Sequence, residues 1–155
     1  MHDLAVALAR QQLEFSHDAS LHTVCYLVVM TTGTWFVLCD PSRAITLSDL
    51  ADRLKRLKNS TPRYENGTLV VVAHDPNGDA DVDVALSTAS HVIVEAQEIA
   101  ERHGRPELAT LAGRYELLFD IAKSDLVYNT LARISGELET VCGGVIYAAN
   151  DGRFV

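Results

Sequence analysis

One segment constrains the fold of this chain more than any other: the apolar run 69–73 and the acid-rich stretch 74–83 that follows it. The run Leu-Val-Val-Val-Ala is short, rich in β-branched residues and bounded by Gly67 and Pro76, which is typical of a buried strand. The acid-rich stretch brings one histidine and several carboxylates into a loop after that strand. Ligands often bind just beyond strand ends, so this loop is the best candidate site.

Composition limits the classes of protein and partner. The 155 residues are 48% hydrophobic, which is enough for one core, so we expect a single globular domain over 1–155. Lys and Arg number 13 against 21 Asp and Glu, giving a net charge of −8. Such a charge disfavours binding to nucleic acid or to anionic membranes, and it favours a basic protein partner or bound cations.

The chain also lacks the patterns of a targeting or membrane-spanning segment. The apolar stretch 4–9 is short and has no basic segment before it, and the apolar region 24–39 is interrupted at 31–34. We therefore expect a soluble, cytoplasmic protein. Cys25, Cys39 and Cys142 are too far apart for a disulfide framework or a zinc site, which predicts reduced and mostly buried thiols.

Helical and strand patterns alternate in the first half. We predict a helix over 3–14, then a hairpin of strands 24–30 and 35–39 whose turn contains Gly33. The loop length decides whether Cys25 and Cys39 lie opposite each other or on different faces. A helix over 47–57 follows, with Thr46 as its N-cap, and then a loop over 59–67.

The second half predicts more helix than strand. After the strand 68–73 and the acidic loop we expect helices over 84–103, 106–123 and 125–142, then a terminal hairpin of 145–149 and 153–155. The fold class is α+β. Its mixed or antiparallel sheet has about 4–5 strands, two hairpins plus a central strand, covered by about five helices, of which three are consecutive in the C-terminal half.

The last long helix carries a regular apolar stripe. Its members are spaced alternately by four and three residues: Val127, Leu131, Ile134, Leu138 and Val141. This heptad spacing is consistent with packing inside the chain's own fold. A homodimer that pairs through the 125–142 helix is the alternative.

The acidic loop offers hard oxygen ligands. Every second residue has a side-chain oxygen ligand: Asp75, Asn77, Asp79, Asp81 and Asp83. An extended backbone would therefore place several oxygen ligands on one side for Mn²⁺, Mg²⁺ or Ca²⁺. With His74 the four aspartates form the candidate metal set. The EF-hand pattern is not met, and the aspartates of a solvated loop could instead cap the following helix.

This stretch also resembles a known motif. A buried strand, then His74-Asp75-Pro76-Asn77-Gly78-Asp79-Ala80, then a helix resembles the first metal-binding motif of DHH-type phosphoesterases. The resemblance implies that His74, Asp75 and Asp79 hold Mn²⁺, with Asp81 orienting water or a second ion for attack on a phosphodiester. The chain departs from that motif at Asn77, where an aspartate is usual, and has no Asp-His-His triplet downstream.

No set of residues completes a catalytic site, which argues against an enzyme. Aromatic and arginine side chains are favoured at interfaces, and the last two long helices carry Tyr115, Tyr128, Arg114 and Arg133. We therefore predict a small acidic binding or regulatory protein, such as an inhibitor, an immunity-type or a sequestering protein, that contacts a basic partner. The alternatives are a metal-dependent phosphoesterase that uses the 74–83 loop and a small-ligand-binding protein.

Overall fold

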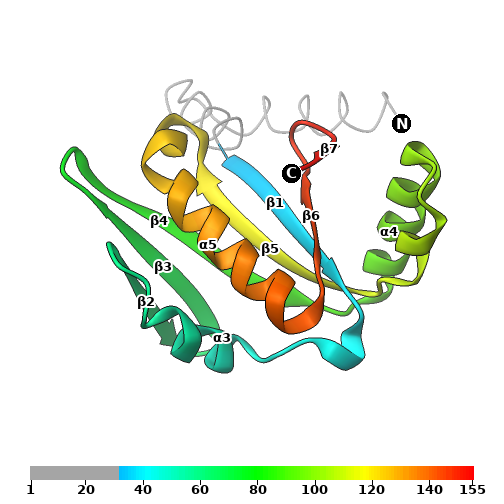
Figure 1. The fold of residues 1–155 in the computed structure, drawn as a ribbon, viewed down its shortest axis with the longest axis horizontal. Helices are drawn as coiled ribbons and strands as arrows, with labels where there is room; N and C mark the ends of the chain where they lie inside the picture. Colours follow the sequence, from blue (N-terminus) through cyan, green and yellow to red (C-terminus); the bar gives the residue numbers. More distant parts are fainter. Residues whose placement is uncertain (1–31) are drawn as a thin grey trace, which may run out of the picture. The chain divides into compact units, whose positions relative to one another are not determined.

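Seven antiparallel strands form one sheet in the computed structural model, which describes residues 32–155. Their order across the sheet is β2-β3-β4-β5-β1-β6-β7, so β1 lies between β5 and β6 (Figure 1). The bounds are β1 Thr32–Cys39, β2 Ser60–Glu65, β3 Thr68–Asp75, β4 Gly78–Ser87, β5 Gly113–Asp120, β6 Val145–Ala148 and β7 Arg153–Phe154.

Three α-helices accompany the sheet within these residues, together with three short 3-10 segments. Thr46 begins the first helix by accepting a hydrogen bond from the Asp49 backbone N–H at 3.1 Å. Gly104, with φ of 62°, ends the second in the left-handed conformation that glycine adopts without strain. The bounds are α3 Leu47–Leu54, α4 Ser90–His103, α5 Ser124–Cys142, η1 Pro41–Arg43, η2 Pro106–Thr110 and η3 Ile121–Lys123.

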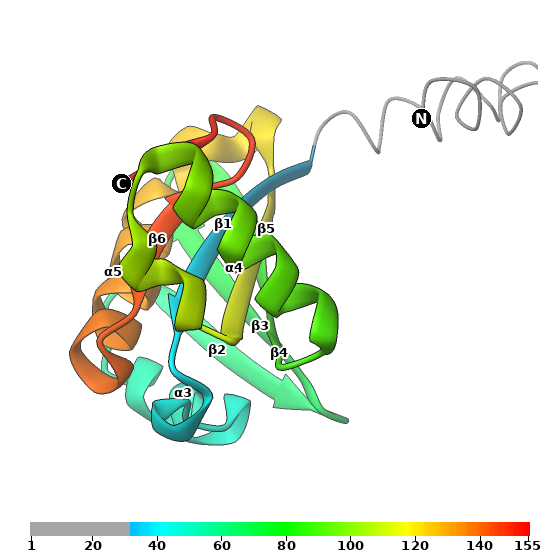
Figure 2. The same ribbon diagram turned by 90° about the vertical axis from the view of Figure 1, so that its right-hand side faces the viewer.

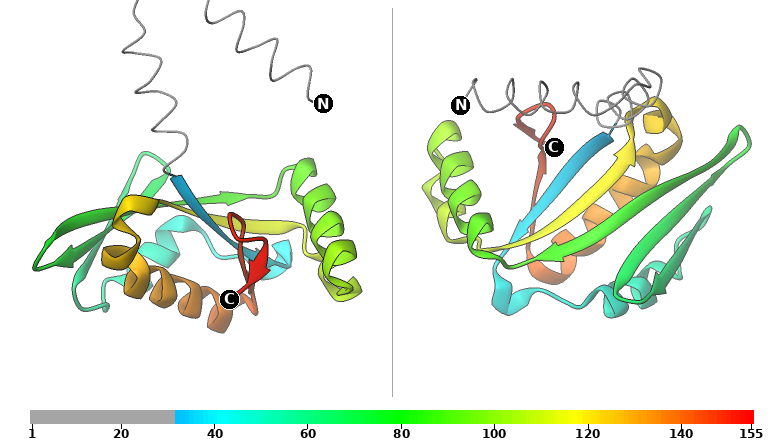
Figure 3. Two further views of the ribbon diagram at one scale, coloured as in Figure 1. Left: turned by 90° about the horizontal axis from the view of Figure 1, so that it is seen from above. Right: turned by 180° about the vertical axis from the view of Figure 1, so that it is seen from behind.

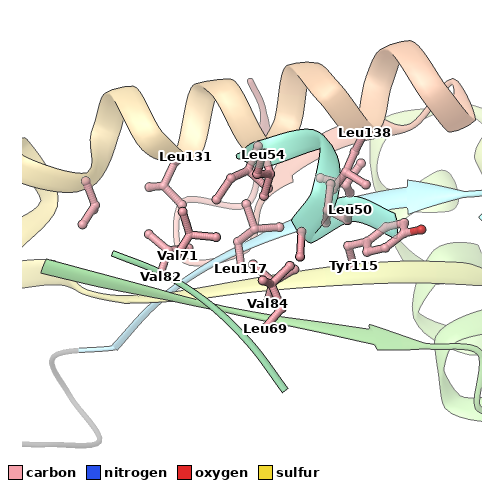
Figure 4. Packing of buried hydrophobic residues seen from close by; sticks show 14 of the residues in the cluster. Leu50, Leu54, Leu69, Val71, Val82, Val84, Tyr115, Leu117, Leu131 and Leu138 are labelled. Carbon is pink, nitrogen blue, oxygen red and sulfur yellow. The ribbon is translucent and has the colours of Figure 1, made fainter. Parts of the chain in front are cut away.

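Helices α3 and α5 pack on one face of the sheet, which we call the covered face (Figure 3, left). Leu50 and Leu54 of α3 lie against Leu131 and Leu138 of α5 and against Leu117 of β5 (Figure 4). All five side chains are essentially inaccessible to solvent. Burial of each large aliphatic side chain is worth about 1.5–3 kcal/mol, so this layer supplies most of the stabilisation.

Within residues 32–155, helical segments cover the opposite face at one end only. Helix α4 and η2 pack over β1 and β6, and Figure 2 shows α4 in front of β1 and β5. Ile99 of α4 and Leu108 of η2 bury Leu38 of β1 and Tyr147 of β6 there. This second core is smaller than the first, and it contains no residue of β2, β3 or β4.

The α+β class is confirmed, and several predicted elements are present. The helix predicted over 47–57 is α3, the strand predicted over 68–73 is part of β3, and the last long helix is α5. The terminal hairpin is β6 and β7, joined through residues 149–152. These elements have strong local signals, namely caps, apolar periodicity or glycine turns. Such signals depend on neighbouring residues and not on distant parts of the chain.

The predicted number of strands was too low, because β2, β4 and β5 were assigned to other structure. Residues 59–67, predicted as a loop, contain β2, and residues 84–87, predicted as helix, belong to β4. The helix predicted over 106–123 is wrong as well, since η2 and β5 occupy it. Pairing of β5 with β1 on one edge and β4 on the other outweighs the helical spacing of its apolar residues.

The hairpin predicted near the start of the described chain is also wrong in part. Residues 35–38 of β1 pair with β5 on one edge and with β6 on the other, so they are not one arm of a two-stranded hairpin. The predicted helix 3–14, the predicted strand 24–30 and Cys25 lie outside the described residues. Residues 32–155 hold three α-helices, and the prediction of about five was for the whole chain.

The apolar stripe of α5 packs inside the chain's own fold. Val127, Leu131, Ile134 and Leu138 face the sheet and are at most 1% exposed. The homodimer through the 125–142 helix stays a prediction, and it would require other residues of that helix. No helix within residues 32–155 is both long and apolar enough to span a membrane.

Candidate functional site

Strand β4 has two unlike faces. Ala80, Val82 and Val84 are buried on the covered face, whereas the aspartates between them point to the opposite face and are exposed. This follows from the alternation of side chains along a strand. The expectation that an extended backbone aligns several carboxylates is therefore confirmed for Asp79, Asp81 and Asp83, although they lie in a strand and not in a loop.

Neighbouring strands extend this surface through the register of the sheet. Asp81 lies beside Val72 of β3, which lies beside Thr61 of β2. The next row holds Asp83, Val70 and Arg63. The polar side chains are exposed and the two valines are half-buried. We call this surface the acidic face, and its residues are Thr61, Arg63, Glu65, Thr68, Val70, Val72, His74, Asp79, Asp81 and Asp83.

The acidic face is incompletely neutralised. The Arg63 guanidinium lies 4.0 Å from the Asp81 carboxylate, at the limit of an ion pair, and both side chains are 57% exposed. The pKa of the Asp83 carboxyl is raised above its ordinary value, first because the group is partly buried and then because Asp81 is negatively charged. A positive charge placed near Asp83 would favour the ionised carboxylate and so offset both effects.

The β3–β4 hairpin projects from the sheet (Figures 1 and 3). Near its end, a chain of hydrogen bonds joins side chains of β2, β3 and β4. His74 Nδ1 lies 3.0 Å from Asp79 Oδ1, and His74 Nε2 lies 2.8 Å from Thr61 Oγ1. The His74 and Asp79 side chains are 44% and 61% exposed. The sheet register positions all three groups, because His74 is directly opposite Asp79 in the β3–β4 ladder.

The fifth predicted metal ligand lies elsewhere. Asp75 pairs with Gly78 at the hairpin end, and its carboxylate accepts a hydrogen bond from the Asn77 N–H at 2.8 Å. Strand alternation places it on the face opposite His74, so the structure brings together four of the five candidates. Asp75 instead lines a small polar cavity of about 90 Å³ with Lys58, Asn59, Ala73, His74, Leu126, Asn129, Thr130 and Arg133.

Within residues 32–155 no three His, Cys, Asp or Glu side chains form a group that could hold a metal ion. The acidic-face residues lie along a strand, where alternate side chains are about 6.8 Å apart, and so they do not converge on one point. The metal site stays a prediction, and so does the phosphoesterase that depends on it.

Arg114 and Tyr115 are in β5, not on a helix, and they point to opposite faces. Tyr115 is fully buried on the covered face, where its hydroxyl donates to the Ile45 carbonyl at 2.6 Å and accepts from the Ile45 N–H at 2.8 Å. Burial raises the pKa of Tyr115 to about 12. It holds the connection before α3 against the sheet.

Arg114 is only 4% exposed and fixes α4 to the sheet. Its guanidinium forms ion pairs with Glu95 of α4 and Glu116 of β5, and it lies 4.2 Å from the centre of the Phe36 ring. These contacts satisfy the guanidinium inside the fold. Arg114 therefore presents little surface to a partner.

The other two predicted interface residues are accessible and lie on α5. Tyr128 is 56% exposed and packs edge-on against Trp35, with ring centres 6.1 Å apart. Arg133 donates to the Lys58 carbonyl at 2.9 Å. The binding role of the four residues stays a prediction, and the structure places one pair inside the fold and the other on its surface.

Sequence reasoning missed the β2 side of the acidic face, including Thr61 and Arg63. A signal was present, because Asn66-Gly67 is the dipeptide most favoured in a two-residue hairpin turn. Both residues have positive φ, 52° and 83°, as that turn requires. Recognising this turn would have placed β2 beside β3, and would have brought Thr61 next to His74.

Two further features lie away from the acidic face. Cys39 and Cys142 are buried free thiols joined by a hydrogen bond, which lowers the pKa of Cys142 to about 7 and raises that of Cys39. A shallow hollow of about 510 Å³ is lined by residues of both charge signs: Ile45, Asp49, Asp52, Arg53, Arg56, Leu57 and Glu137.

The chain matches no protein-family model, no curated protein and no solved structure.

Proposed function

We propose that this protein binds a basic segment of a partner protein through its acidic face and acts as a regulatory or sequestering protein. One observation carries the proposal: Asp79, Asp81 and Asp83 lie in line on an exposed sheet surface. The net charge of −8 supports it, because long-range attraction would speed the encounter with a basic partner.

The spacing of the carboxylates favours an extended partner segment. Alternate residues of β4 are about 6.8 Å apart, and alternate residues of any extended chain repeat at the same interval. Lysine or arginine at every second position of the partner would therefore meet successive aspartates. The side chains between them would point away from the acidic face, so they are free to vary.

Val70 and Val72 add an apolar component to this surface. Both are half-buried in β3 and lie directly beside Asp83 and Asp81. The stems of lysine and arginine are apolar, so they can cover these valines while their charged ends reach the aspartates. An apolar centre with charged neighbours is the usual composition of a protein interface.

The test is an affinity measurement with two labelled peptides of equal composition, one with alternating Lys and Thr and one with the lysines in a block. We expect the alternating peptide to bind more tightly. The double variant Asp81→Asn and Asp83→Asn should weaken its binding about fivefold at low salt, because two exposed ion pairs are lost. Added salt should reduce this difference.

The matched control is the double variant Asp125→Asn and Glu139→Gln, which removes the same charge from exposed positions of α5. We expect it to have a much smaller effect on the alternating peptide. Equal weakening by both variants would show that only net charge matters, and it would contradict binding at the acidic face.

A further inference from the structure

The hydrogen-bonded chain Thr61–His74–Asp79 has a property that partner binding does not use. Its three groups are a hydroxyl, an imidazole and a carboxylate, joined at 2.8 Å and 3.0 Å. They come from β2, β3 and β4, so a three-stranded ladder fixes their positions. The hydroxyl contacts Nε2 and the carboxylate contacts Nδ1, which is the order of groups in hydrolytic Ser-His-Asp triads.

The position of the protons follows from the chemistry of the three groups. An ionised Asp79 only accepts hydrogen bonds, so Nδ1 of a neutral His74 must carry the proton. Nε2 then has a free electron pair, and the Thr61 hydroxyl donates to it. Asp79 thus fixes the tautomer in which His74 can take a proton from Thr61.

The nucleophilic oxygen is accessible, and a cation lies on the same face. Thr61 is exposed, as are His74 and Asp79. Arg63 lies two residues along β2 and approaches Asp81, which is in the same row of the sheet as Thr61. A guanidinium at this place can stabilise the negative oxygen that forms when a carbonyl is attacked near Thr61.

We propose that Thr61 is a nucleophile that accepts an acyl group from esters, with His74 as its general base and Asp79 as the positioning residue. Thr61 Oγ1 bonds to the carbonyl carbon while its proton moves to Nε2. The bond from that carbon to the alcohol oxygen breaks, and the leaving alcohol takes the proton from Nε2. Water then repeats the sequence, which releases the acid and restores Thr61.

The surroundings of Thr61 limit the substrate class. Asp81 and Asp83 would repel esters that carry a carboxylate or a phosphate, whereas neutral and positively charged esters are not repelled. The site is open and not enclosed, so small unhindered esters fit it best. This inference does not rest on the proposed function, which uses Asp79, Asp81 and Asp83 as charges alone.

The experiment treats the whole chain with p-nitrophenyl acetate and follows both nitrophenolate release and the mass of the protein. We expect an added acetyl group that maps to Thr61. Thr61→Val should abolish this adduct, and Asp79→Asn or His74→Gln should slow its formation about 100-fold. Thr140→Val, which changes an exposed threonine of α5 outside the acidic face, is the matched control and should leave the acetylation of Thr61 unchanged.

Two outcomes would overturn the inference. The first is wild-type protein without an acetyl group on Thr61 when acid stops the reaction while the ester is still in large excess, a result that does not depend on the folding of any variant. The second is an unchanged rate of nitrophenolate release by Thr61→Val, which would show that the His74 imidazole reacts without Thr61. Neither outcome affects peptide binding by the acidic face, so the two proposals fail separately.

Discussion

The two faces of β4 differ sharply in their exposure to solvent. On the covered face Ala80, Val82 and Val84 are at most 3% exposed, whereas the Asp81 side chain on the acidic face is 57% exposed. Both sets share one backbone and one register. The comparison teaches that one face of the strand holds the fold together and that the other is free to carry charge for binding.

Truncating two adjacent leucines of β5 tests this difference most strongly. Leu117 is fully buried on the covered face, and Leu118 is half-buried on the other. Leu117→Ala should lower the free energy of unfolding by about 3 kcal/mol, because it leaves a cavity under α5. Leu118→Ala should cost less than about 1 kcal/mol. If urea unfolding gave similar losses of free energy for the two variants, the two faces would contribute equally to stability.

A pair of tyrosines tests the same contrast for a polar group. Tyr115→Phe removes the hydroxyl that pairs with both the N–H and the carbonyl of Ile45, so it should cost about 2 kcal/mol in urea unfolding. Tyr128→Phe, on the surface of α5, should change the stability by less than about 0.5 kcal/mol. If Tyr115→Phe left the free energy of unfolding unchanged, the two buried hydrogen bonds to Ile45 would not anchor the connection before α3.

Neutralising one carboxylate of the acidic face should raise stability slightly. The raised pKa of Asp83 means that the folded state disfavours its charged form, so its contribution to stability falls as pH rises from 3.8 through the folded pKa. Asp83→Asn removes this penalty and should raise the melting temperature by about 1 °C at neutral pH, allowing for solvent screening.

The gain from Asp83→Asn should disappear below pH 3.8, where the wild-type carboxyl is protonated in both states. A lower melting temperature for Asp83→Asn at neutral pH would show that the carboxylate is stabilised in the fold, which would remove one reason to expect a cationic partner.

Local signals in the sequence were sufficient for part of this fold. Thr46 and the leucines of α3, the apolar stripe of α5 and the glycine turns predicted elements that are present. Strand β5 could not be predicted in this way, because Tyr115, Leu117 and Phe119 fit both a strand face and part of a helical stripe. Its partners β1 and β4 lie far away in sequence, and pairing with them decides the structure.

The candidate site was predictable in one strand and not across strands. Alternation alone aligned Asp79, Asp81 and Asp83, since it needs no knowledge of neighbours. The contacts of Asp81 with Arg63 and of His74 with Thr61 depend on the β2–β3–β4 register, which the sequence pattern did not reveal. The same register was needed to show that Asp75 lies on the other face of the sheet from His74 and the β4 aspartates.

The most direct test of the central claim is a titration of ¹⁵N-labelled protein with the alternating Lys-Thr peptide, followed by backbone amide chemical shifts. We predict that the largest shifts fall on residues of β2, β3 and β4, including Val72, Asp81 and Asp83. Shifts concentrated instead at Asp49 and Glu137, which line the hollow between α3 and α5, would contradict the claim that the acidic face is the binding surface.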